Sequence, residues 1–234
     1  MELYNKLIEE IMSFLPDSRK YDFEPSEVCR KTDSSTLILS KDAAFEFGGG
    51  ALPAVNSTLF STDADISDCV MLCGKDIAEV SGDTPYARIA LIKLKKEAMP
   101  DDDEIYKQLK DIELSKYHVY PDGCLIRLSP ESRREQIRIS KKAVKERLSL
   151  KNIGFAFIEE YKKNPLVSAV SIVFVTDKSY DYKTLGAASE KASAITESLN
   201  KILEGLEISC DTCELKSICD EVEGLRQLHF GKER

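Results

Sequence analysis

The sequence predicts an α/β or α+β fold, in which a mixed sheet carries flanking helices and a Cys-rich appendage follows at the C-terminus. Strand-like apolar runs alternate with segments of helical spacing, and no clear linker separates them. The 234 residues suffice for one large core or two small ones. We therefore expect an N-terminal helix and linker over 1–35, an α/β body over 36–206 and a Cys-rich metal-binding tail over 207–234.

The N-terminal part is predicted to contain a helix and then a hairpin. Apolar residues recur at steps of three and four over residues 3–15. Two short strands are expected at 36–40 and 43–47, joined by a turn. The glycines 48–50 that follow lack both the spaced glycines of a dinucleotide site and the Gly-Lys-Ser/Thr of a phosphate loop. A turn that ends the strand is therefore expected there.

The middle of the chain is predicted to contain both strands and helices. Strands are expected at 69–73, 88–94, 125–128 and 136–139, with Cys69 and Cys73 as small core residues. The acidic residues 101–103 suit a helix start better than a metal site. Two further helices are predicted, one capped by Ser140 and one by Asn152.

The last part of the body is the most regular. Residues 167–175 form the most β-branched and apolar run of the chain, which predicts a central strand. A long helix is expected over 182–206, because apolar side chains recur there at helical steps. This helix leads directly to Cys210.

Composition excludes several classes of function. The net charge of −8 is spread over intermixed acidic and basic residues, which argues against nucleic acid as a partner. No run of apolar residues is long enough to span a membrane, and the N-terminus lacks the pattern of a secretion signal. We therefore expect a cytoplasmic protein, whose seven cysteines point to metal or redox chemistry more than to disulfides.

The candidate metal ligands lie in the tail: Cys210, Cys213, Cys219 and His229. Two thiolates in a Cys-x-x-Cys turn can reach one metal ion, and this set suits either zinc or an iron–sulfur cluster. A redox Cys-x-x-Cys pair is disfavoured because the motif follows a long helix. Free thiols, or a metal-free tail that packs through apolar side chains, remain alternatives. The fourth ligand is His229 or one of four other cysteines, Cys29, Cys69, Cys73 and Cys124.

Several stretches, taken in order, resemble the middle domain of acetyl-CoA synthase, the beta subunit of the carbon monoxide dehydrogenase/acetyl-CoA synthase complex. The resemblance extends from about residue 40 to 220. It rests on Phe45-Glu-Phe-Gly-Gly-Gly50 with Pro53-Ala54, Gly74-Lys-Asp-Ile77, Arg138-Ile-Ser-Lys-Lys-Ala-Val144, Lys151-Asn-Ile-Gly154, Val170-Ser-Ile-Val-Phe-Val-Thr-Asp177 and Cys210-x-x-Cys213.

The resemblance implies a [4Fe-4S] cluster at the tail cysteines, with zinc as the alternative. In the family four cysteines hold this cluster and a separate Cys-Gly-Cys holds a nickel ion. Here Cys210, Cys213 and Cys219 match the first three, His229 stands near the fourth, and no Cys-Gly-Cys occurs. The resemblance therefore implies an accessory or partner protein in one-carbon or corrinoid metabolism that is not active by itself. A subunit of a methyl- or acyl-transfer enzyme whose nickel another chain supplies is the alternative.

The expected partner is a corrinoid protein or another subunit of the complex. A contact with coenzyme A is also expected, through the basic residues Arg133, Arg134 and Arg138, because guanidinium groups bind phosphates with paired hydrogen bonds. The competing interpretation is a solvated loop in which these arginines pair with Glu131 and Glu135.

Overall fold

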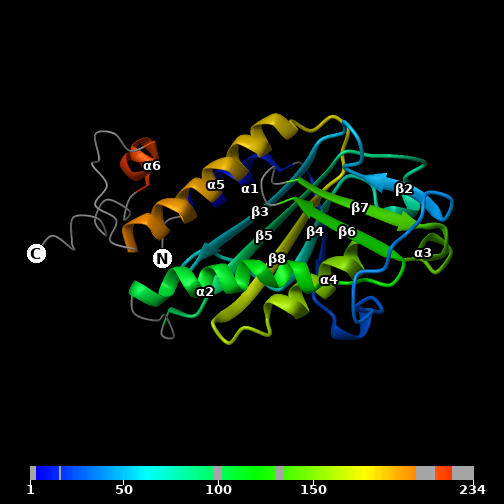
Figure 1. Cartoon of the computed structure of the whole chain (residues 1–234), viewed down its shortest axis with the longest axis horizontal. Helices are drawn as coiled ribbons and strands as arrows, with labels where there is room; N and C mark the ends of the chain where they lie inside the picture. The colour runs from blue at the N-terminus through cyan, green and yellow to red at the C-terminus, as the bar shows by residue number, and fades with distance from the viewer. Residues whose placement is uncertain (1–3, 16, 97–101, 130–133, 204–213, 223–234) are drawn as a thin grey trace, which may run out of the picture.

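A five-stranded mixed sheet with the order β1-β4-β8-β5-β3 forms the centre of the molecule (Figure 1). The computed structural model describes residues 4–15, 17–96, 102–129, 134–203 and 214–222. The fold class is the mixed α/β arrangement that the sequence predicts. The strands are β1 (Arg19–Asp22), β3 (Ala54–Ser61), β4 (Cys69–Cys73), β5 (Tyr86–Leu94) and β8 (Val167–Val175).

A second, antiparallel sheet has the order β2-β7-β6. Its strands pair in a register that places Phe45 opposite Ile139 and Phe47 opposite Ile137. Through β7 it packs against β3 and β5 of the larger sheet. The two sheets therefore share one core. The strands of the second sheet are β2 (Ala43–Phe47), β6 (Cys124–Ser129) and β7 (Arg134–Ser140).

Helices cover both faces of the five-stranded sheet (Figure 1). Helix α4 packs on β8 and β4, whereas α5 packs on β3 and is itself contacted by α1, α2 and α6. Three short 3-10 turns complete the described part: η1 (Pro25–Glu27), η2 (Ile77–Glu79) and η4 (Ser115–His118). The helices are α1 (Asn5–Phe14), α2 (Asp102–Leu114), α3 (Lys141–Lys145), α4 (Leu150–Tyr161), α5 (Tyr182–Leu203) and α6 (Lys216–Glu221).

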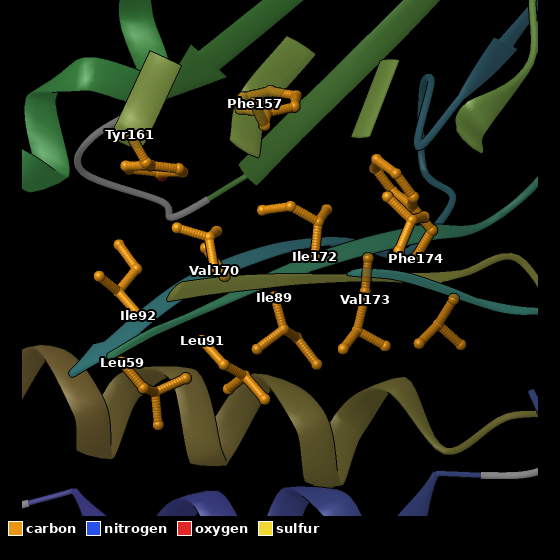
Figure 2. Packing of buried hydrophobic residues seen from close by; sticks show 14 of the residues in the cluster. Leu59, Ile89, Leu91, Ile92, Phe157, Tyr161, Val170, Ile172, Val173 and Phe174 are labelled. Atoms are coloured by element: carbon orange, nitrogen blue, oxygen red, sulfur yellow. The ribbon is translucent and has the colours of Figure 1, made fainter. Parts of the chain in front are cut away.

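Strand β8 is central, as its apolar run predicts. It pairs in parallel with β4 and antiparallel with β5. Its side chains alternate between two apolar layers, so that Ile172 points toward Phe157 of α4 and Val173 points toward α5 (Figure 2). A strand buried on both faces needs mostly apolar residues, which explains why only Ser168 and Ser171 interrupt the apolar run of β8.

Helix α1 closes the α5 side of the core with its apolar stripe. Leu7, Ile8 and Ile11 are buried. The buried hydroxyl of Tyr4 lies 2.8 Å from Oγ1 of Thr196 in α5. The predicted helix over 3–15 is thus confirmed at residues 5–14.

The predicted strand at 36–40 is wrong. These residues are irregular, and the side chains of Leu37 and Leu39 are exposed. The carbonyl of Leu39 accepts hydrogen bonds from the amides of Asp42 and Ala43, which makes a turn directly before β2. The edge of β2 that a hairpin partner could use is instead paired with β7, which lies far away in the sequence.

Two strands were absent from the prediction, and one helix cap is corrected. Strand β1 lies in the segment that was predicted to be a linker, and β3 lies where no element was predicted. Helix α4 is capped by Ser149, whose Oγ accepts from the amide of Asn152, so Asn152 lies inside the helix. Ser140 caps α3 as predicted, by accepting from the amide of Ala143.

Among the described residues, no helix combines the length and apolar character needed to cross a bilayer.

Candidate functional site

The described part of the Cys-rich tail is α6, which packs against α5 near its C-terminal end (Figure 1). Ile218 packs against the core and Val222, one helical turn later, is buried. These two side chains share one face of the turn, because residues four apart are neighbours on a helix. The backbone of Cys219 lies between them. The other predicted ligands, Cys210, Cys213 and His229, lie outside the described residues.

The four remaining cysteines belong to the body and behave as core residues. Burial raises the pKa of Cys29 to about 12 and that of Cys73 to about 11, and raises the pKa of Cys124 as well. The buried Sγ of Cys69 lies 3.4 Å from Oγ of Ser171. A metal ligand must be a thiolate, and a raised pKa disfavours that form.

Cys124 lies far from α6, the helix of the tail. Strand β6, which Cys124 begins, belongs to the three-stranded sheet at the end of the molecule opposite α6 (Figure 1). Within the described ranges, no three His, Cys, Asp or Glu side chains form a group that would hold a metal ion. The metal site therefore stays a prediction that rests on tail residues, of which the structure describes the helix that carries Cys219.

Arg134 of β7 binds the glycine turn after β2. Its Nη2 donates to the carbonyl oxygens of Gly48 (3.2 Å), Gly50 (3.0 Å) and Leu52 (3.0 Å). Gly48 and Gly50 have positive φ values of 68° and 57°, and a Cβ on Gly48 would lie 2.6 Å from Cβ of Ala54. The predicted turn is confirmed. It needs glycine for its backbone conformation and for its close approach to β3.

Arg138 of β7 connects β2 to the segment that precedes it. Its Nε donates to Oε1 of Glu46 (2.5 Å) and its Nη1 to the carbonyl oxygen of Ile38 (2.8 Å). Both charged side chains are largely buried. Arg134 and Arg138 thus bind groups of the chain itself, whereas Arg133 lies outside the described residues. Their contact with coenzyme A stays a prediction.

A buried ion pair between Arg88 of β5 and Glu135 of β7 was missed in the sequence. Arg88 Nε lies 2.8 Å from Oε1 and 3.0 Å from Oε2 of Glu135, and the hydroxyl of Tyr86 donates to Oε1 at 2.9 Å. Both charged side chains have no exposed surface. The Arg88 guanidinium carbon lies 4.2 Å from the ring centroid of Phe157. The signal that points to this pair is a charged residue inside an otherwise apolar strand.

Electrostatics keep the guanidinium of Arg88 charged. Burial lowers the pKa of Arg88, but the Glu135 carboxylate outweighs that effect and the pKa is raised overall. Burial, and then the same carboxylate, raise the pKa of the Tyr86 hydroxyl, which stays protonated as a donor. The pair joins the two sheets, and it lies too deep to contact a ligand from solvent.

One comparison with known proteins identifies the chain. The family described as the CO dehydrogenase/acetyl-CoA synthase complex beta subunit matches residues 34–180, which is more than half of the sequence. Among curated proteins, none is similar enough to be matched. The matched region extends from the segment before β2 to the residues between β8 and α5, and so contains both sheets except β1. On this evidence the chain belongs to the CO dehydrogenase/acetyl-CoA synthase complex beta subunit family.

Proposed function

We propose that this chain is an iron–sulfur protein, or a zinc protein, that acts as an accessory or partner subunit in one-carbon or corrinoid metabolism. One observation carries the proposal. The helix that bears Cys219 packs on α5, the helix that directly follows the family-matched region. Cys219, one of the proposed ligands, is therefore carried by an element that packs on the family scaffold.

The donor chemistry of the tail fits such a group. Cys210, Cys213 and Cys219 would supply three thiolates and His229 an imidazole, a set that suits a tetrahedral zinc ion or a cluster with one nitrogen ligand. A bound cluster would supply one-electron redox chemistry, and a bound zinc ion would order the tail. The packing of Ile218 and Val222 supports an anchored tail, because it places one proposed ligand on a helix attached to the core.

Elemental analysis of anaerobically purified protein tests the proposal. Iron with sulfide, or zinc, is expected in the wild type and should be lost in Cys210→Ser and Cys213→Ser. Cys29→Ser is the matched control, because Cys29 is a partly buried thiol of the body and should leave the metal content unchanged. Metal-free protein that was never exposed to air would contradict the proposal, as would full metal content in both tail variants. His229→Ala then shows whether the imidazole is the fourth ligand.

The expected partner follows from the family, whose name places its members in a multi-subunit complex. A corrinoid protein or another subunit of that complex is the partner we propose. Cosedimentation of the metal-loaded chain with a corrinoid protein should give a defined complex, and its absence at micromolar concentrations would contradict this part. If the mixture with methylated corrinoid protein, carbon monoxide and coenzyme A formed acetyl-CoA, the enzyme-subunit alternative would hold instead.

A further inference from the structure

A polar cavity of about 260 Å³ lies beside β3. Strand β3 ends the order of the five-stranded sheet, so the cavity lies where one strand edge is not used by β5. Side chains of α2, η4 and α5 close it. Hydroxyl groups dominate its lining: besides Ser57 and Thr58 of β3, they come from Tyr106, Tyr117, Ser129, Ser193 and Thr196.

Two of these hydroxyls are buried without a hydrogen-bond partner. Ser57 has 5% of its surface exposed and Thr58 has 8%, and neither Ser57 Oγ nor Thr58 Oγ1 has a hydrogen-bond partner among the residues that the structure describes. A buried hydroxyl that stays unpaired costs stability, so each group calls for a partner in the cavity. Adjacent strand residues point to opposite faces. Leu59 points toward α5 in Figure 2, so Ser57 lies on that face and Thr58 on the other.

A buried ammonium group completes the polar lining. Lys116 of η4 is 7% exposed, and its Nζ lies 2.7 Å from Oε1 of Glu113 and 3.5 Å from Oδ1 of Asn56. Its charge is therefore compensated by Glu113. The lining contains a second carboxylate, Glu197, which is exposed. Because Glu113 already compensates the ammonium of Lys116, the lining offers an anion no uncompensated positive charge, whereas its hydroxyls both donate and accept hydrogen bonds.

We propose that this cavity binds a small uncharged polyhydroxylated molecule, such as a monosaccharide or a cyclic polyol. Such a ligand would accept from or donate to Ser57 and Thr58 and would place apolar ring faces against Tyr106 and Tyr117. The volume supports a small ligand, because sites for drug-sized molecules measure about 300–1,000 Å³. It also exceeds by far the roughly 30 Å³ that one water molecule occupies in the liquid.

Ligand-detected NMR on the full-length protein tests the proposal. The probes are D-glucose, D-ribose and myo-inositol, with acetate and inorganic phosphate as anionic comparisons. At least one uncharged probe should bind at millimolar concentration, and the anions should not. Ser57→Ala and Thr58→Val should each weaken that binding about tenfold, the expected loss for one hydrogen bond.

Ser198→Ala is the matched control. Ser198 of α5 also carries a buried hydroxyl without a partner, but it does not line the cavity. This variant should bind the probe as the wild type does, and circular dichroism should show that all three variants fold. The proposal is overturned if no uncharged probe binds, if an anion binds best, or if Ser198→Ala weakens binding as much as the two cavity variants. Because it involves neither the tail nor a metal, the proposal stands or falls separately from the proposed function.

Discussion

Arg88 and Glu135 meet in the interior between the two sheets, and neither side chain has any exposed surface. Two guanidinium nitrogens of Arg88 contact both carboxylate oxygens, and Nη1 of Arg88 has no hydrogen-bond partner in the described part of the chain. Each charge is far from water, so each depends on the other for its stabilisation. This pair is the strongest polar connection between β5 and β7 in the described part of the chain.

Replacing Glu135 with Gln should lower the free energy of unfolding by about 3–5 kcal/mol, because the charge of Arg88 would stay buried without a counter-charge. Urea denaturation measures the change. Glu159→Gln is the control, since Glu159 pairs with Lys31 at the surface and should cost less than about 1 kcal/mol. Equal costs for the two variants would contradict the role of burial. The double variant Arg88→Met/Glu135→Leu should lose less stability than Glu135→Gln.

Removal of the Arg134 guanidinium should loosen the glycine turn over 48–52. Arg134→Ala breaks three charged hydrogen bonds to carbonyl oxygens and should cost about 1.5–3 kcal/mol. The amide of Leu52, which donates to the Gly49 carbonyl, should then exchange faster with deuterated water. Arg127→Ala, at an exposed position of β6, should change stability by no more than about 0.5 kcal/mol. Unchanged exchange at Leu52 would argue against this role of Arg134.

Two glycines at the same position of different helices should respond in opposite directions to alanine. Gly154 of α4 faces β4, where a Cβ would collide with Val70 and lie 3.0 Å from Phe174, so Gly154→Ala should cost about 1–3 kcal/mol. Gly186 of α5 has no atom within 4 Å of its Cβ position, and alanine there should stabilise by about 0.5–1 kcal/mol. Thermal denaturation distinguishes them, and stabilisation by both would refute the close packing at α4.

Stability should fall at alkaline pH in part through Cys29. Burial raises the pKa of this thiol from 9.0 to about 12, with a smaller opposing effect from Lys31. The folded state therefore holds the proton more tightly. The stabilisation that the protonated Cys29 thiol gives the folded state is fully present below pH 9 and is lost as the pH rises toward about 12. The free energy of unfolding of Cys29→Ala should decline less over this range than that of the wild type. Parallel declines would contradict the raised pKa.

The sequence predicts the elements with continuous patterns. Strand β8 and helix α5 follow from a run rich in β-branched residues and from regular helical spacing. Strand β3 was missed because Asn56, Ser57 and Thr58 interrupt its apolar run. These same residues line the cavity beside β3, so the polar positions that hid the strand belong to the proposed binding site.

Pairing between distant segments is the part that local patterns do not specify. Residues 36–40 have the composition of a strand, yet β2 pairs with β7, about ninety residues later. Glu135, the partner of Arg88, also comes from β7, and no spacing in the sequence relates the two residues. The contact of Arg134 and Arg138 with coenzyme A stays a prediction, and the partners described for these arginines are groups of the chain itself.

The position of β8 has a consequence for how the protein folds during synthesis. Strand β8 lies between β4 and β5, yet it is the last of the described strands to leave the ribosome. Until β8 is synthesised, β4 and β5 lack the strand that pairs with both of them, and the five-stranded sheet cannot be completed. Pairings over such sequence separations form slowly and leave intermediates prone to aggregate. A nascent chain stalled before residue 167 should therefore remain a substrate for chaperones. Once α5 has emerged from the ribosome, the chain should no longer need them.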